Sequence, residues 1–203
     1  LSESQRRVVD CAQQNRVHID HAQLRHTLDS LEYPLWFLDY ESCISAIPLF
    51  DGHWPQQQIL FQYSLHKIAH PGAKLEHFAF LSFEPGNPLP ALMAQLREDL
   101  GDEGSVIVWN KNFETTRHKE LMQLYPQHSV YLENINSRVF DLMDIVSKHM
   151  VYDPRFNGRY GLKNVLPILV PELSFDELPI NIGSKASVAW WQMNAGLLSE
   201  KIL

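Results

Sequence analysis

The chain has 203 residues, of which 45% are hydrophobic and 20% are charged, so it can bury a substantial core and is not a low-complexity or disordered protein. Its 17 basic and 24 acidic residues give a formal charge of -7, which excludes a global basic field of the kind that attracts nucleic acid non-specifically. Any contact with nucleic acid is therefore expected to be local.

Cysteine usage and the lack of long apolar segments bear on the compartment. Cys11 and Cys43 have no spacing typical of metal ligands and could form one disulfide at most, which favours a reducing compartment. No stretch approaches about 18 consecutive apolar residues and the start has no signal-peptide pattern, so we expect no membrane span and no membrane partner. The protein is predicted to be cytoplasmic.

The first thirty-two residues differ from the rest in being polar and rich in Gln, Arg and His. They predict two short helices, Ser2–Gln14 and Asp20–Leu31, each of which starts at a favourable N-cap residue. We interpret residues 1–32 as a helical lead-in, with the tail of a preceding domain as one explanation. Residues 33–203 are predicted to form the main domain.

From Tyr33 onward the pattern predicts strands and then an alternation of helices and strands. The predicted strands cover Leu35–Asp39, Gln58–Ile68, Leu75–Leu81, Ser105–Trp109 and a short piece around Val139. The predicted helices cover Leu89–Leu100, the segment from Asn110 to Pro126, Leu142–Met150, Leu162–Leu169 and Ser184–Asn194. The first three strands follow one another as hairpins do, so we expect an α/β fold with a mixed sheet.

Two carboxylates come at the end of the first apolar strand. Asp39 and Glu41 are two residues apart, and the period of a strand places their side chains on the same side. Acids placed in this way repel each other unless a cation lies between them, and a divalent metal accepts several carboxylate ligands. The alternative is that both residues simply mark the point where a strand surfaces.

A further carboxylate follows the strand Ser105–Trp109. Glu114 is expected in the first turn of the next helix, close to the end of a neighbouring strand, where it could face Asp39 and Glu41. An acid in this position is also explained by the dipole of the helix alone.

These two motifs resemble those of the RNase H-like, DnaQ-like 3′-5′ exonucleases, which carry Asp-x-Glu on the first strand and typically Asn-x-x-Phe-Asp after a later one. The wider sequence resembles one bacterial family of that fold, whose members are largely uncharacterised and often fused behind a RecB-like nuclease domain. The matching segments are Tyr33–Ser42, Phe61–His66, Trp109–Glu114, Arg138–Leu142 and Tyr160–Pro167. The resemblance implies an RNase H-like five-stranded mixed sheet, with three antiparallel strands followed by parallel strands, flanked by helices.

The resemblance also implies a metal-dependent nuclease, specifically a 3′-5′ exonuclease that hydrolyses terminal phosphodiesters of DNA or RNA at a single-stranded end. Asp39, Glu41 and Glu114 would be the catalytic residues and would bind two Mg²⁺ or Mn²⁺ ions. An N-terminal nuclease domain of the same parent chain is an implied partner. The alternatives are a non-catalytic module that binds nucleic acid or docks on a partner nuclease, and a nucleotidase.

Three other residues have predicted supporting roles. Asp141 is expected to support the site from outside the metal shell, which is favoured over direct ligation. Asn110 is a candidate contact to a terminal nucleotide, although a cap on the next helix is favoured for it. Lys163 is a candidate phosphate contact, with a solvated helix lysine as the alternative.

The chain departs from the superfamily pattern at two motifs. The acid of the second motif is Glu114, whereas the superfamily usually has Asp here; the bacterial family that the chain resembles also uses Glu. The third motif is a late Tyr or His followed by Asp, but the helical segment Ala186–Asn194 contains no acid. We therefore expect the third motif beyond Leu203, in a chain truncated at its C-terminus, with a natural pseudoenzyme as the alternative.

Overall fold

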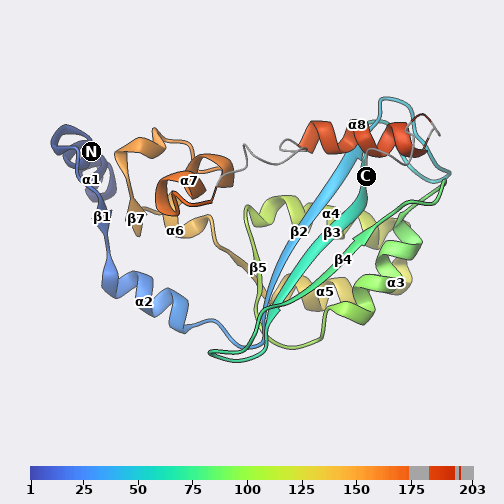
Figure 1. Cartoon of the computed structure of the whole chain (residues 1–203), viewed down its shortest axis with the longest axis horizontal. Coiled ribbons are helices and arrows are strands. Elements are labelled where there is room, and N and C mark those ends of the chain that lie inside the picture. Colours follow the sequence, from blue (N-terminus) through green and yellow to red (C-terminus); the bar gives the residue numbers. More distant parts are fainter. Residues whose placement is uncertain (174–182, 195–196, 198–203) are drawn as a thin grey trace.

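The computed structural model describes residues 1–173, 183–194 and 197 of the chain. Two groups of elements lie next to each other along the long axis (Figure 1). One is a five-stranded sheet with its helices, and the other is a smaller group built from the N-terminal segment and from residues 142–170.

The sheet is mixed, with the strand order β4-β3-β2-β5-β6. Its strands are β2 (Leu35–Ile44), β3 (Gln58–Ile68), β4 (Glu76–Leu81), β5 (Val106–Val108) and β6 (Val139–Asp141). β2, β3 and β4 are antiparallel neighbours, whereas β5 and β6 run parallel to β2. The predicted α/β class, with a mixed five-stranded sheet flanked by helices, is therefore confirmed.

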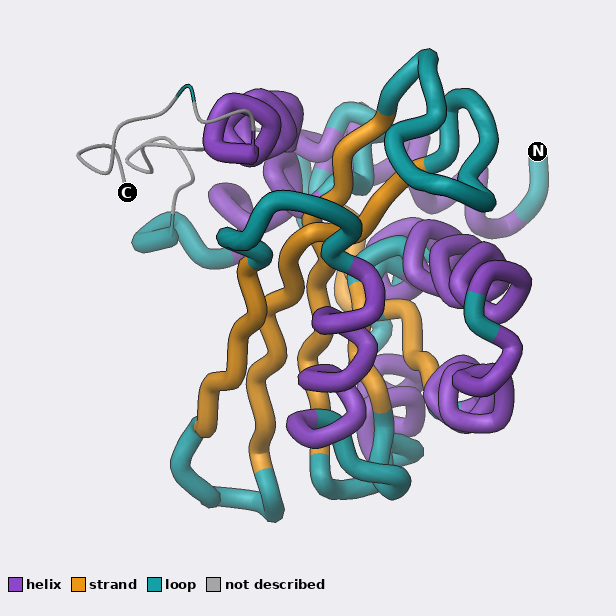
Figure 2. Tube along the Cα trace, turned by 90° about the vertical axis from the view of Figure 1, so that its right-hand side faces the viewer, coloured by secondary structure: helices purple, strands orange, loops and turns teal. Residues whose placement is uncertain are grey.

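Three helices pack on one face of the sheet, and a fourth lies across the far end of β2 (Figures 1 and 2). They are α3 (Leu89–Asp99), α4 (Lys111–Leu124), α5 (Ser129–Ser137) and α8 (Gly183–Asn194), and a short 3-10 turn, η1 (Pro126–His128), joins α4 to α5. Helix α5 was not predicted. In the part of the chain that is described, the opposite face of β3 and β4 carries no helix along most of its length (Figure 2).

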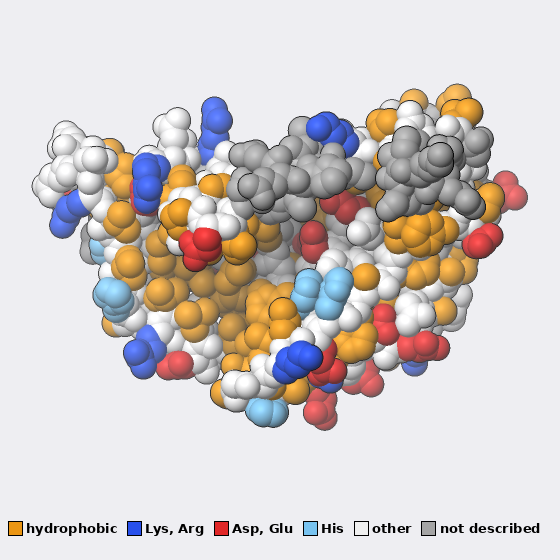
Figure 3. All heavy atoms as spheres, viewed as in Figure 1, with side chains coloured by type: hydrophobic (Ala, Val, Ile, Leu, Met, Phe, Trp, Pro, Cys, Tyr) orange, Lys and Arg blue, Asp and Glu red, His pale blue; other side chains and the backbone are white. Residues whose placement is uncertain are grey.

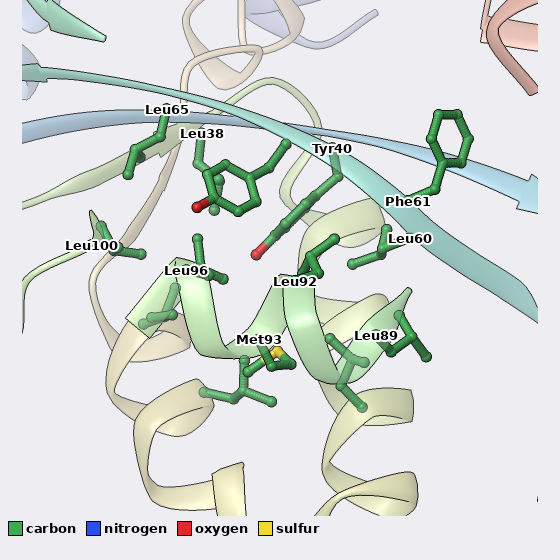
Figure 4. Packing of buried hydrophobic residues seen from close by; sticks show 14 of the residues in the cluster. Leu38, Tyr40, Leu60, Phe61, Leu65, Leu89, Leu92, Met93, Leu96 and Leu100 are labelled. Carbon is green, nitrogen blue, oxygen red and sulfur yellow. The ribbon is translucent and has the colours of Figure 1, made fainter. Parts of the chain in front are cut away.

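The main core lies between the sheet and these helices (Figure 4). Leu38 and Tyr40 point from β2 toward α3, where Leu92 and Leu96 are fully buried. Burying a leucine side chain contributes roughly 1.5–3 kcal/mol, so each of these leucines stabilises the packing of α3 on the sheet. Phe61 points the other way (Figure 4).

Strand β2 is longer than predicted. It continues to Ile44 instead of ending at Asp39, because the eleven residues of β3 supply backbone partners along its whole length. A β-bulge interrupts the pairing between Glu41 and Ser42, and Phe61 is the residue of β3 left without a direct partner. Asp39 and Glu41 therefore lie inside a strand that projects beyond its parallel neighbour, and not at a strand end.

A glycine allows β5 to approach the start of β2. Gly104 has a φ of 82°, and a Cβ atom on it would lie 2.0 Å from the backbone oxygen of Pro34. No side chain fits in that space, so only glycine permits the contact. The parallel pairing of Trp36 with Val106 begins two residues further on.

In the smaller group, the N-terminal segment 1–32 pairs with residues 150–152, which follow the sheet in the sequence. Strand β1 pairs antiparallel with β7, and the backbone N–H of Asp20 donates to the carbonyl of Met150 at 2.8 Å. The elements are α1 (Glu3–Gln14), β1 (His18–Ile19), α2 (His21–Asp29), α6 (Asp144–Ser147), β7 (Val151–Tyr152), η2 (Pro154–Phe156) and α7 (Leu162–Leu169). Residues 1–32 are thus packed on the rest of the protein.

The predicted caps of the first two helices are confirmed. The hydroxyl of Ser2 accepts from the backbone N–H of Gln5, and the carboxylate of Asp20 accepts from that of Gln23. The predicted helix Leu142–Met150 is wrong in length, because only α6 is helical and the chain then turns into strand β7.

The smaller group has its own core. Ile145, Val146 and Phe156 are buried there, and Leu24 of α2 packs against them. None of the described helices is long and apolar enough to cross a membrane.

Candidate active site

The predicted acids of β2 lie on the face of the sheet opposite α3. Asp39 is paired with Ser64 across the sheet, and Glu41 with Gln62. Figure 3 views this face: it is hollowed between the sheet and the α6–α7 region, with hydrophobic side chains lining the hollow and acidic and histidine side chains near its edge. The two carboxylates therefore point away from the main core, as the period-2 prediction requires.

The ending of β5 brings Glu114 toward these acids. The parallel pairing of β2 with β5 is recorded at Trp36 and Phe37, and β5 ends at Val108. The chain then turns at Asn110, where φ is 74°, and enters α4. Since β2 continues past this point, the first turns of α4 lie beside the stretch that carries Asp39.

Glu114 is the most unusual group of the site. Its side chain is 2% exposed, and its Oε2 atom is buried without a hydrogen-bond partner. Burial above all, together with the charges of Asp39 and Asp141, raises the pKa of Glu114 to about 8, against the smaller opposing effect of a backbone hydrogen bond. An unpaired buried carboxylate oxygen costs free energy unless a proton or a cation neutralises it.

The other two acids are also shifted toward their neutral forms. The pKa of Asp39 is raised by loss of solvation, although the side chain is exposed, and that of Glu41 by loss of solvation and then by Asp39. The ammonium group of Lys163, on α7, lowers the pKa of both. Asp39 is thus within electrostatic range of three other predicted site residues, Glu41, Glu114 and Lys163.

The donor set fits a hard divalent cation, since it consists of carboxylate oxygens and includes the unpaired Oε2 atom of Glu114. In the described part of the chain, however, no three His, Cys, Asp or Glu side chains lie close enough together to hold a metal ion as they stand. The acids form a loose cluster and not a closed cage.

Asp141 holds the start of α4 from the neighbouring strand β6. Its Oδ1 atom accepts from the backbone N–H of Asn110 at 2.9 Å and its Oδ2 atom from that of Lys111 at 3.0 Å. Oδ1 also accepts from the N–H of Met143 at 3.1 Å. Its carboxylate is thus bonded to backbone amides, and the supporting role at a metal site stays a prediction.

The favoured role of Asn110 as a helix cap is wrong. Asn110 occupies the N-cap position of α4, but its side chain makes no capping hydrogen bond. The left-handed backbone of Asn110 turns the first amides of α4 toward β6, where Asp141 accepts from them instead. Asn110 directly precedes the helix that carries Glu114, and its contact with a nucleotide stays a prediction.

The first residues of α8 lie next to Glu41 and the residue that follows it. A Cβ atom on Gly183 would lie 3.3 Å from Oε2 of Glu41, and the hydroxyl of Ser187 donates to the carbonyl of Ser42 at 2.7 Å. Beside them is a cavity of about 250 Å³, lined by Glu41, Phe61, Trp190 and Met193 among others. The predicted third motif lies outside the described residues.

Sequence reasoning missed two residues that link β2 to α4. Tyr40, between the two acids, is hydrogen-bonded to His118, which lies four residues after Glu114 on α4. The spacing of Glu114 and His118 was a usable signal, because residues four apart share one face of a helix.

Comparisons with known proteins find similarity over most of the chain, but only to proteins of unknown function. A family model described as a domain of unknown function (DUF2779) matches residues 36–161, more than half of the chain. A protein of Ureaplasma parvum serovar 3, named Uncharacterized protein UU173, is 31% identical over 149 residues, which are 67% of this chain and 21% of that protein. The chain thus spans about a fifth of the length of this curated relative. No solved structure matches.

Proposed function

The chain belongs to the family of the domain of unknown function DUF2779, and we propose that it is a metal-dependent nuclease, specifically a 3′-5′ exonuclease acting on DNA or RNA. The observation that carries the proposal is Glu114 of α4, which is buried with an unpaired oxygen and whose pKa is raised by Asp39 of β2. Asp39 also raises the pKa of Glu41, two residues further along the same strand. Perturbed acids gathered at one place are typical of catalytic sites.

We also propose that the fold is RNase H-like. The strand order supports this, since β2 is central, three antiparallel strands come first and two parallel strands follow. The sequence resemblance places acids on the first strand of the sheet and after a later parallel strand. β2 and the start of α4, which follows β5, are those two positions.

The electrostatics of the cluster favour a cation. The charge of Asp39 raises the pKa of both Glu41 and Glu114, so the three groups resist being ionised together. Mg²⁺ or Mn²⁺ held by Asp39, Glu41 and Glu114 would remove this repulsion. When bound, two such ions supply an activated water and stabilise the leaving oxygen in phosphodiester hydrolysis.

Substrate phosphate would meet Lys163. Its side chain is exposed on α7 and its charge acts on both Asp39 and Glu41. An ammonium group in this place offers an electrostatic contact to a phosphate held at the carboxylates. The net charge of -7 repels nucleic acid, so a positive charge at the site itself would be needed to attract a phosphate there.

The test is nuclease activity of the intact protein with Mn²⁺ on end-labelled single-stranded DNA and RNA. Asp39→Asn should lower the rate by about 100-fold or more without unfolding the protein, because it removes a charged ligand at the metal site. Asp51→Asn, a matched change at an exposed turn, should leave the rate unchanged.

Three results would contradict the proposal or redirect it. Equal activity of Asp39→Asn and wild type would exclude the carboxylate mechanism. Binding of nucleic acid that needs no metal and survives Asp39→Asn would favour the non-catalytic module. Hydrolysis of mononucleotides without digestion of the labelled strands would favour a nucleotidase.

A further inference from the structure

A buried chain of hydrogen bonds runs from β2 through α4 to α5. The hydroxyl of Tyr40 lies 3.0 Å from Nε2 of His118, and Nδ1 of His118 lies 2.6 Å from Oδ1 of Asn136. The Tyr40 and His118 rings also meet edge to face, at an interplanar angle of 89°. Three elements are thus joined through one imidazole.

The chemistry of the three groups fixes the direction of this chain. An amide oxygen only accepts, so Nδ1 of His118 carries the hydrogen that Asn136 binds. In a neutral imidazole the other nitrogen is then an acceptor, so the Tyr40 hydroxyl donates to Nε2. Every polar atom of the His118 ring is therefore satisfied.

Burial makes the arrangement rigid. His118 is completely buried and Tyr40 is 4% exposed. Burial lowers the pKa of His118 to about 4, so the ring stays neutral at ordinary pH and keeps this hydrogen-bond pattern. A partner lost in such surroundings leaves an unsatisfied buried group, which is costly, so alternative positions of α4 are disfavoured.

These hydrogen bonds join β2 and α4, the two elements that carry the candidate metal ligands. Tyr40 stands between Asp39 and Glu41 and projects to the opposite face of β2. Glu114 and His118 are four residues apart, so they lie only about 40° from each other around the axis of α4. Fixing the direction of His118 therefore fixes the direction of Glu114.

This constraint is distinct from the one at the helix start. Asp141 holds the first backbone amides of α4 against β6, which sets where the helix begins. The bond from Tyr40 to His118, two turns further on, sets the rotation of the helix about its axis relative to β2.

We propose that Tyr40, His118 and Asn136 are positioning residues that hold the Glu114 carboxylate in register with Asp39 and Glu41. The role rests on the proposed metal site. None of the three touches the metal or substrate in this scheme; they act by keeping α4 in one rotational position against β2.

The experiment compares two tyrosines of the same buried layer. Tyr63 is paired with Tyr40 across the sheet, is equally buried, and donates its hydroxyl to Asp99 of α3 instead of to α4. Mn²⁺ affinity is measured by titration calorimetry for the wild type, Tyr40→Phe and Tyr63→Phe, at a temperature where all are folded. Tyr40→Phe should weaken binding by about 10-fold or more, and Tyr63→Phe by no more than about twofold.

A second variant guards against misfolding of the first. Asn136, on α5, is half-buried and forms the last hydrogen bond of the network, so Asn136→Ala removes the acceptor of the His118 ring. This variant should weaken Mn²⁺ binding in the same way as Tyr40→Phe. Should Tyr40→Phe fail to fold, Asn136→Ala against Tyr63→Phe decides the matter. Equal affinities in that comparison would overturn the positioning role.

The proposed function fails in a different way. A wild-type protein that binds no Mn²⁺ overturns the metal site, and the positioning role with it. Wild-type binding that Tyr40→Phe and Asn136→Ala leave unchanged overturns the positioning role alone.

Discussion

Glu114 places a carboxyl group in the interior of the protein, 2% exposed, with one oxygen unpaired. Because its folded pKa of about 8 lies above the ordinary value of 4.5, the neutral form is favoured in the folded metal-free state. The protonated group stabilises the folded state fully at pH values below the pKa that Glu114 has in the unfolded chain. This stabilisation is lost as the pH rises through the higher pKa of the folded state. The same carboxylate would be ionised when a cation is bound.

We predict that the metal-free protein becomes less stable between about pH 5 and pH 9, by a few kcal/mol, as Glu114 is forced to ionise. Glu114→Gln should flatten this dependence, since an amide does not titrate. The measurement is urea unfolding in the presence of a chelator across this pH range. An unchanged slope in the Gln variant would show that another group is responsible.

At the scale of elements, α4 is capped from outside its own sequence. Sequence logic assigns the cap to the residue just before a helix, here Asn110, but a residue in the left-handed region directs its side chain elsewhere. Asp141 fills the role because β6 runs parallel beside β5 and ends at the same edge. Which carboxylate reaches the amides is thus a matter of strand neighbours.

We predict that Asp141→Ala lowers the free energy of unfolding by about 2–3 kcal/mol, because three backbone N–H groups lose a charged acceptor. Asp20→Ala, which removes a cap of one hydrogen bond from α2, should cost only about 1 kcal/mol. Chemical denaturation of both variants gives the comparison. Equal losses would mean that the Asp141 bonds add little beyond an ordinary cap.

At the scale of the whole molecule, the chain has two cores, and the N-terminal segment contributes to the second of them. The main core packs under the sheet, whereas the second is closed by α2 and by the pairing of β1 with β7. The family model covers residues 36–161, so this segment lies outside the matched region although it is part of the fold.

We predict that Leu24→Asp lowers the stability of the protein by about 1–3 kcal/mol, because it places a charge against the second core. Leu28→Asp, one turn further along α2 at a residue that is 42% exposed, should change it by about 0.5 kcal/mol or less. Urea unfolding measures both. A harmless Leu24→Asp would mean that the N-terminal segment contributes no packing energy.

Much of the framework was predictable because it depends on local pattern. β3 and α7 have the predicted bounds, and the alternation of β2 placed Asp39 and Glu41 on one side. Two of the errors share one cause: β2 was predicted too short and the helix Leu142–Met150 too long. In both, a strand partner distant in sequence, β3 or β1, decided where the element ends.

For the candidate site, the sequence alone determined which residue types were available and on which side of their own element they lie. It could not determine that Asp141 caps α4, that Tyr40 binds His118, or that Glu114 is buried with an unpaired oxygen. Those facts depend on hydrogen bonds and burial between segments about 30 to 80 residues apart. Periodicity acts within one element, whereas such contacts exist only once the whole chain has packed.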